Sequence, residues 1–239
     1  MIIKGRNACT EALKNDKFAI SKVYLLDGGK GFDEALQLCK KRRANYSFVT
    51  KDALNRLAEG DNHQGIVLQA TEFVYANLND VLNDLKKQEQ KVFFIICSEI
   101  SDPHNLGAII RSADFAGANA VIISKNNSCP VNETVFKTSA GACFNLPIIQ
   151  VSNIAQTIET IKKQNVFVFA CEVGGTDYTK IDFKGDTAIV VGGEDEGVKP
   201  LVKKLCDEVV SIKNNGKVSS LNASVAAAVV MFEAARQRG

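Results

Sequence analysis

The segment Val92–Ile123 places the tightest limit on how this chain can fold. Residues 92–97 have the length and apolar composition of a buried strand, and a polar break follows at Pro103. Proline lacks an amide N–H and disfavours helix at the preceding residue, so the chain turns there. Apolar residues then recur at helical spacing up to Gly117, and residues 121–123 form a second apolar run. Strand, helix and strand in this order predict a parallel sheet in an α/β fold.

Two polar residues of this segment are candidates for function. Asn105, the expected N-cap of the helix, follows a strand end, which is where ligands bind to α/β sheets. Arg111 lies on the helix among small apolar residues. In the structural alternative, Asn105 only caps the helix and Arg111 pairs with Asp114 three residues later. The segment alone leaves both interpretations open.

Length and composition exclude several classes of protein. The 239 residues suffice for one or two domains, and 46% of them are apolar. No apolar run approaches the roughly 20 residues of a membrane span, and the first residues lack the apolar core of a signal peptide. We therefore expect a soluble, cytoplasmic protein. Seven cysteines without a C-x-x-C spacing, and only two histidines, argue against a metal site.

The succession of predicted elements divides the chain into three parts. We expect a small α/β domain in residues 1–70, a linker and lead-in helix in 71–90, and a larger α/β domain in 91–239. Residues 1–70 hold 12 Lys and Arg against 8 Asp and Glu, a balance of +4, with a basic cluster at residues 40–43. Such a cluster suits RNA phosphates, although a solvated helix end has the same composition.

Two further stretches place polar residues after predicted strands. Gly192, Gly193 and Gly197 follow an apolar strand, but their spacing is not that of a dinucleotide loop, and three acids lie between Gly193 and Gly197. Acids repel a pyrophosphate and suit a cationic or uncharged flat ligand, whereas an ordinary tight loop needs only the glycines. Ser220 is the expected N-cap of a long final helix, with Asn222 in its first turn.

The final helix carries apolar residues on nearly every face. We therefore expect it to be deeply buried, and a dimer interface is one way to bury it. Earlier in the domain, Gly174-Gly175 is expected to form a turn after a buried strand at residues 166–170.

Together these stretches resemble the SpoU family of RNA ribose methyltransferases, part of the SPOUT superfamily. The matching motifs are DPHNLGAIIRSA at 102–113, VGGEDEG at 191–197 and SLNASVA at 220–226, in the family's order. The resemblance covers the C-terminal domain. Gly5-Arg6-Asn7-Ala8 and His63-Gln64-Gly65 are similar to the small substrate-binding domain of one branch of the family.

The resemblance carries expectations about fold and activity. It implies a C-terminal parallel sheet with a trefoil knot, preceded by a small α/β RNA substrate-binding domain. It also implies a homodimer, S-adenosyl-L-methionine as cofactor and RNA as partner. The similar branch methylates the ribose 2′-hydroxyl of a guanosine in large-subunit ribosomal RNA. Transfer RNA ribose methylation, and a non-catalytic RNA-binding protein that kept the fold, are the alternatives.

The resemblance also assigns roles to residues. Arg111 would orient the ribose and a neighbouring phosphate and stabilise the developing alkoxide, and a general-base role is the weaker alternative because a guanidinium is almost never neutral. Asn105 would orient Arg111 or the ribose, and Glu194, beside a cationic cofactor, would hold Arg111. Ser220 and Asn222 would contact cofactor or substrate. The expected cofactor contacts all lie at or after strand ends: Val191, Gly192, Gly193, Gly197, Ile212, Leu221 and Ala223.

One departure from the family pattern concerns the cofactor pocket. After residue 212 the family usually has Pro-Met, whereas this chain has Lys213-Asn214. Backbone contacts to a cofactor survive such a change, but the apolar cover from the methionine is lost. Ser98 also stands where relatives often carry Asp.

Overall fold

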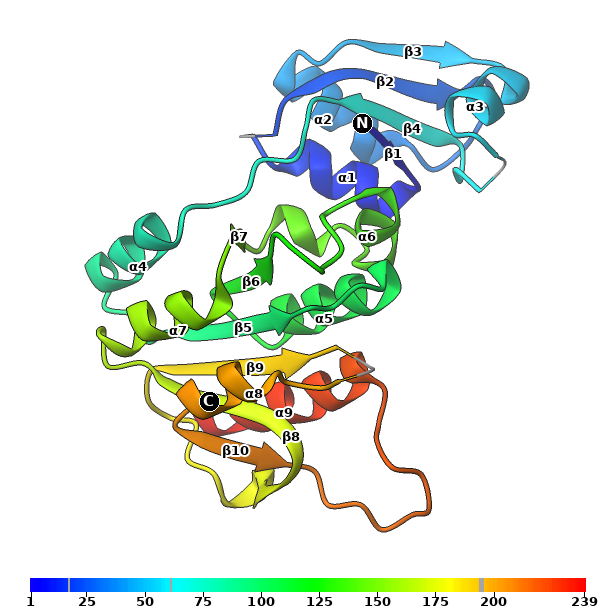
Figure 1. Ribbon diagram of the computed structural model, residues 1–239. Helices are drawn as coiled ribbons and strands as arrows, with labels where there is room; N and C mark the ends of the chain where they lie inside the picture. Colours follow the sequence, from blue (N-terminus) through cyan, green and yellow to red (C-terminus); the bar gives the residue numbers. More distant parts are fainter. Residues whose placement is uncertain (17, 61, 194–195) are drawn as a thin grey trace. The chain divides into compact units, whose positions relative to one another are not determined.

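The computed structural model describes residues 1–16, 18–60, 62–193 and 196–239, and the chain forms two compact units. The first unit holds Met1–Val74 together with Val131–Asn145, and the second holds Tyr75–Pro130 together with Leu146–Gly239. Each unit has its own sheet (Figure 1).

The first unit is built on a four-stranded sheet in the order β1-β4-β2-β3. β2 and β3 are parallel, whereas β4 runs antiparallel to both of its neighbours. Strands and helices alternate in this unit, as expected for a small α/β domain. The elements are β1 (Ile2–Lys4), α1 (Arg6–Lys14), β2 (Ile20–Leu26), α2 (Asp33–Arg42), β3 (Tyr46–Val49), α3 (Lys51–Leu57), β4 (Ile66–Ala70), α6 (Glu133–Thr138) and the short 3-10 helix η1 (Ala142–Phe144).

The segment 131–145 belongs to the first unit although it lies far along the sequence. Its Phe136 and Phe144 stack with ring centroids 5.0 Å apart, and Phe144 also packs on Phe18 at 4.8 Å. Asn15 donates to the carbonyl of Phe144 at 2.6 Å. Buried aromatic side chains of this kind contribute much of the apolar core of a small unit. The segment 131–145 is therefore part of the core of the first unit.

Arg42 has a structural role in the first unit. Its guanidinium donates to the carbonyls of Ala12 and Leu13 at 3.0 and 3.1 Å, and to that of Phe18 at 2.7 Å. The first two carbonyls belong to the last turn of α1, where helical partners are missing. Arg42 therefore caps α1, while its neighbour Arg43 is exposed.

We expect Arg42→Ala to lower the free energy of unfolding by about 3 kcal/mol, because each hydrogen bond from a charged donor contributes on the order of 1.5–3 kcal/mol. Urea denaturation measures this change. The matched control is Arg43→Ala, which should stay within about 0.5 kcal/mol of the wild type. Equal effects of the two substitutions would show that the Arg42 contacts contribute nothing special to stability.

The second unit is built on a six-stranded sheet in the order β10-β8-β9-β5-β6-β7, and every neighbouring pair is parallel. The predicted parallel α/β sheet is therefore confirmed, while the trefoil knot stays a prediction. The elements are α4 (Leu78–Lys87), β5 (Phe93–Ser98), α5 (Pro103–Phe115), β6 (Ala120–Ser124), β7 (Ile148–Val151), α7 (Ile154–Lys162), β8 (Phe167–Asp177), the short 3-10 helix η2 (Tyr178–Lys180), β9 (Thr187–Gly192), α8 (Pro200–Leu205), β10 (Glu208–Ser211) and α9 (Ala223–Arg238).

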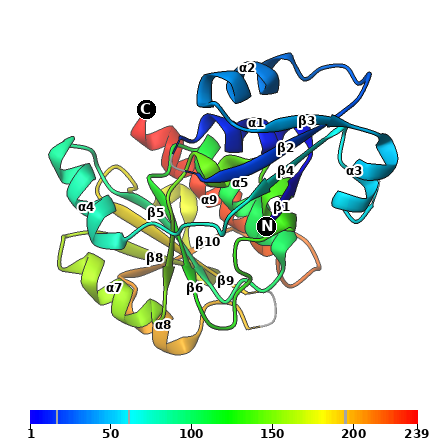
Figure 2. The same cartoon turned by 90° about the horizontal axis from the view of Figure 1, so that it is seen from above.

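Helices cover both faces of this sheet (Figure 2). α4, α7 and α8 bury their apolar side chains on one face, together with Phe94 and Ile96 of β5. α5 and α9 pack against each other on the opposite face. A strand covered on both faces must be apolar throughout, which is why residues 92–97 show no alternation in sequence.

The predicted turn at Gly174-Gly175 lies inside β8, which continues to Asp177. The chain is irregular there, because Ala170 pairs with Val209 and Thr176 with the next residue, Val210, so residues 171–175 have no β10 partner, and Gly174 has a φ of 78°. A Cβ on Gly175 would overlap the carbonyl of Val209. The glycine therefore serves close approach of two backbones, a function that the sequence does not distinguish from a turn.

Within the described residues, no helix is both long and apolar enough to cross a membrane. The seven cysteines are free thiols, and five of them are buried. Burial raises the pKa of Cys97 to about 12 and that of Cys171 to about 11. The reactive thiolate is therefore scarce at neutral pH, and these cysteines act as packing residues.

Candidate active site

The first motif begins α5, and Asp102 caps it. The Asp102 carboxylate accepts the N–H of His104 at 3.0 Å, and Pro103 occupies the first helical position. The expectation that Asn105 is the N-cap is therefore wrong. Proline at the first position needs no partner for its nitrogen and has a helical φ, which moves the cap to the residue before it. Asn105 lies in the first turn instead, and only 6% of it is exposed.

The third motif begins α9, and Asn222 rather than Ser220 caps it. The side-chain oxygen Oδ1 of Asn222 accepts the N–H groups of Ser224 at 3.0 Å and Val225 at 3.3 Å. The predicted cap Ser220 is wrong because asparagine two residues later is as good a cap, and Ser220 lies exposed before the helix. The Asn222 amide also donates to Asn105 Oδ1 at 3.0 Å. The first and third motifs therefore meet directly.

The second motif leaves the sheet beside the first. Ser98 at the end of β5 pairs with Gly192 at the end of β9, and Gly197 N–H closes a tight loop by donating to the carbonyl of Gly193 at 3.0 Å. A Cβ on Gly192 would overlap the backbone of Gly197, and one on Gly193 would lie 2.7 Å from the carbonyl oxygen of Glu99. The loop therefore admits no side chain at these positions.

Three residues outside the motifs brace this loop. Glu99 forms an ion pair with Lys199 at 2.7 Å, and Glu172 accepts the N–H of Val198 at 3.1 Å. The hydrogen bond from Lys199 lowers the pKa of Glu99. The ion pair is therefore complete above the ordinary pKa of a glutamate and is lost as the pH falls through the lowered value. Sequence reasoning missed these residues because their roles depend on tertiary neighbours.

The remaining predicted residues are placed less tightly. Val191 is buried in β9, Ile212 follows β10 and is half-buried, and Ala223 is the first residue of α9. Residues 213–222 are all exposed, including Ser220 and Leu221. Glu194, expected to hold Arg111, lies outside the described residues.

Asn214, at the departure from the family pattern, organises its own loop. Its side chain donates to the carbonyl of Val218 at 2.6 Å and accepts the N–H of Gly216 at 2.8 Å. The asparagine thus replaces apolar cover with local hydrogen bonds, and the loop keeps a defined shape.

Arg111 is exposed on α5. In the part of the chain that the structure describes, its guanidinium forms no hydrogen bond and no ion pair, and the pairing with Asp114 does not occur. The structural alternatives for Asn105 and Arg111 therefore do not describe this site.

Two family models match the chain. Residues 92–232 match the SpoU rRNA methylase family, and residues 2–76 match the substrate-binding domain of RNA 2′-O ribose methyltransferases. The chain belongs to the SpoU methylase family. The resemblance found in the sequence is thereby confirmed, and with it an RNA 2′-O-methyltransferase family whose members use S-adenosylmethionine.

Relatives of this SpoU-family chain match it over nearly its whole length. A putative TrmH family tRNA/rRNA methyltransferase, YacO of Bacillus subtilis, is 35% identical over 98% of this chain and 94% of its own. The 23S rRNA (guanosine-2′-O-)-methyltransferase RlmB of Vibrio cholerae is 35% identical over 99% of this chain and 97% of its own. The SpoU methyltransferase AviRb of Streptomyces viridochromogenes, solved with AdoMet, shares the fold with a TM-score of 0.83 and 23% identity, covering 100% of this chain and 90% of its own.

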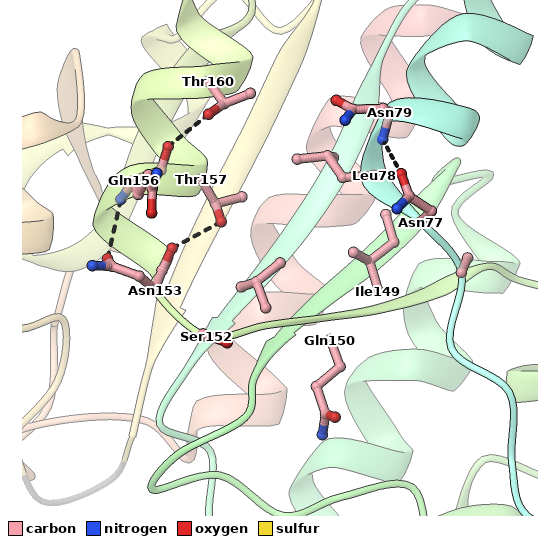
Figure 3. A pocket seen from close by; sticks show the side chains of 12 residues that line it. Asn77, Leu78, Asn79, Ile149, Gln150, Ser152, Asn153, Gln156, Thr157 and Thr160 are labelled. Atoms are coloured by element: carbon pink, nitrogen blue, oxygen red, sulfur yellow. Dashed lines mark hydrogen bonds between the residues drawn. The ribbon is translucent and has the colours of Figure 1, made fainter.

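A separate cavity of about 340 Å³ lies beside the edge strand β7 of this SpoU-family unit (Figure 3). It is lined by the first turns of α4 and α7, where Asn77 and Asn153 cap the two helices. None of the predicted site residues lines it. The site is therefore an assembly of loops rather than this cavity.

We expect Asn222→Asp to lower the kcat of methyl transfer at least tenfold with little loss of stability. Aspartate still caps α9, and its charge suits a helix N-terminus, but it cannot donate to Asn105. Asn222→Ser should behave alike, since serine caps but is too short to bridge to Asn105, which separates loss of the donor from the new charge. Steady-state kinetics and a thermal melt measure both quantities.

The matched control is Asn153→Asp, because Asn153 caps α7 in the same way by accepting the N–H of Gln156 at 3.1 Å. Its activity should remain that of the wild type. A normal kcat in both Asn222 variants would show that the contact between the motifs is purely structural.

Proposed function

We propose that this chain transfers a methyl group from S-adenosyl-L-methionine to the ribose 2′-hydroxyl of a guanosine in large-subunit ribosomal RNA. The observation that carries the proposal is the Asn105–Asn222 hydrogen bond beside the glycine loop, because it supports the three motifs acting as one site. The similarity to RlmB of Vibrio cholerae supports the guanosine. Other relatives are named for both tRNA and rRNA, so transfer RNA is the alternative substrate.

The glycine loop fits the proposed cofactor. A Cβ on Gly192 or Gly193 would collide with the backbone of Gly197 or Glu99, so these glycines let the loop fold tightly and offer a flat adenine backbone N–H and C=O groups in place of side chains. The proposed contacts are Val191, Gly192, Gly193, Gly197, Ile212, Leu221 and Ala223. When bound, S-adenosylmethionine supplies an electrophilic methyl group on a sulfonium, and an acid at Glu194 would suit that positive charge.

The chain's own residues then act by positioning. Transfer to a hydroxyl needs the nucleophile in line with the methyl group, and orientation supplies most of the reduction in barrier. Arg111 would bind the ribose and a neighbouring phosphate and stabilise the alkoxide as its proton leaves. Asn105 would orient Arg111 or the ribose, and Ser220 and Asn222 would contact cofactor or substrate. The exposure of Arg111 supports this role because an arginine bound to its own helix would be occupied.

The functional test uses ribosomal RNA carrying a single 2′-deoxy nucleotide at the mapped site. Labelled methyl transfer should vanish while RNA binding persists, because the acceptor oxygen alone is missing. Unmodified transfer RNA serves as the competing substrate. Methylation of the deoxy RNA would place the methyl group on a base, and preference for transfer RNA would establish the alternative substrate.

In the same assay, Arg111→Ala should reduce kcat by about 10²-fold or more, the size found when one preorganised donor is removed from a developing oxyanion. Calorimetric titration should give the wild-type affinity for S-adenosylmethionine. A near-normal rate in this variant would contradict the role proposed for Arg111.

We also propose a homodimer through α5 and α9. We expected the last helix to be deeply buried, and only part of it is. Ala227 and Val230 are buried, but Phe232 is 43% exposed. Phe232 contacts Phe115 of α5 edge to face, with centroids 5.9 Å apart, and Phe115 is 84% exposed. A paired aromatic patch of this kind supports burial against a second copy.

Phe115→Asp should convert the dimer to a monomer, because a carboxylate at the centre of an apolar interface loses its hydration. Sedimentation velocity measures the change. Phe167→Asp is the matched control, since Phe167 is an exposed aromatic on β8 outside the proposed interface. A wild-type chain that sediments as an active monomer would overturn the dimer.

A further inference from the structure

Two aromatic side chains lie exposed on the edge strand β3 of the first unit. Tyr46 is 37% and Phe48 is 52% exposed, and their rings meet at 90° with centroids 6.1 Å apart. β3 is one of the two edge strands of its sheet (Figure 1). An exposed apolar edge strand promotes unwanted strand pairing, and proteins usually place charges or prolines there instead. Adjacent aromatics at this position therefore indicate a binding surface.

The pairing of β3 with β2 shows how these residues are presented. Tyr46 lies opposite Val23, and Phe48 lies opposite Leu25, and both β2 residues are fully buried. The carbonyl of Asn45 accepts the N–H of Val23 in β2, and the carbonyl of Val49 accepts the N–H of Asp27, the residue that follows β2. Since backbone direction alternates along a strand, the N–H and C=O groups of Tyr46 and Phe48 face away from the sheet. The two rings therefore lie on the same face of the sheet as the buried residues Val23 and Leu25, but they remain exposed. The outward-facing N–H and C=O groups of β3 lie beside them.

The charge of the first 70 residues is concentrated around this strand. Residues 40–56 contain six Lys and Arg and one Asp, a balance of +5, whereas the rest of residues 1–70 contain six basic and seven acidic residues, a balance of −1. Arg42 caps α1, but Lys40, Lys41 and Arg43 are exposed immediately before β3. The positive excess of residues 1–70 therefore lies in the stretch of sequence that contains β3 and its two exposed rings.

We propose that this surface, the β3 strip formed by Lys40, Lys41, Arg43, Tyr46 and Phe48, binds a single-stranded segment of the RNA. The rings stack on unpaired bases, and the basic side chains neutralise neighbouring phosphates. Duplex RNA keeps its bases stacked within the helix, so the aromatic contacts select loops, bulges and ends. The identity of this RNA as the methylation substrate rests on the proposed function, but the binding itself does not.

The test compares two sets of substitutions by fluorescence anisotropy with a short labelled single-stranded RNA and the same sequence as a duplex. Tyr46→Ala with Phe48→Ala should raise the Kd for the single strand by about 10- to 100-fold, leave its salt dependence unchanged and barely affect the duplex. Lys40→Gln, Lys41→Gln and Arg43→Gln together should reduce the slope of log K against log salt by about 2, near 0.7 per phosphate.

The controls are Phe167→Ala and the pair Lys86→Gln and Lys87→Gln, which remove an exposed aromatic and two exposed charges from the second unit. They should leave RNA affinity unchanged. If the aromatic variant binds single-stranded RNA like the wild type while ribosomal RNA is still methylated, the proposal that the β3 strip binds RNA is wrong and the proposed function stands.

If the wild type methylates no RNA, the proposed function fails. The Kd values of the wild type and the aromatic variant for single-stranded RNA still show whether the β3 strip binds RNA. If the aromatic variant instead loses self-association in sedimentation with its RNA affinity intact, the edge pairs with protein and the RNA proposal is overturned.

Discussion

The hydrogen bond between Asn105 and Asn222 is the contact on which the rest of the site depends. It joins two residues that are 117 positions apart in the sequence and lie at the starts of α5 and α9. Asn105 is nearly fully buried, and a buried amide that loses a partner costs about 1–3 kcal/mol, so the bond specifies how α5 and α9 start relative to each other. Capping by Asp102 and by Asn222 itself leaves the α5 and α9 backbones satisfied, so one short contact can align two motifs.

Around this contact the site relies on backbone rather than on titratable side chains. Gly197 donates its N–H to the carbonyl of Gly193, Glu99 pairs with Lys199, and Glu172 accepts the N–H of Val198, so the described ends of the glycine loop are held in place. Fixed donors and acceptors suit a reaction whose barrier falls mainly through orientation. The exposed stretch 213–218 is held differently, by hydrogen bonds that Asn214 forms with Val218 and Gly216 within the loop itself.

Sequence periodicity predicted the buried strand at residues 92–97, the helix that follows it and the final helix, because burial on two faces and helical spacing leave strong patterns. It failed where two local solutions are equally good, as in the choice of Asn222 over Ser220 as cap. It also failed where a residue is required by a neighbour that is distant in sequence. Gly175 is such a residue, because a Cβ there would overlap the backbone of β10. The roles of Glu99, Glu172 and Lys199 were missed for the same reason. Their contacts around the glycine loop form only in the folded chain, and no sequence pattern indicates them.

The distribution of charge assigns different tasks to the two parts of the chain. Residues 71–239 contain 17 basic and 19 acidic residues, so their net charge of −2 gives no general attraction for RNA. Positioning chemistry at a ribose also reads little of the nucleotide sequence, because the acceptor hydroxyl is common to all four nucleotides. Affinity and selection must then come largely from elsewhere, and residues 40–56 combine the required charge with exposed rings. A methyl-transfer site of this kind therefore depends on a separate surface to decide which ribose reaches it.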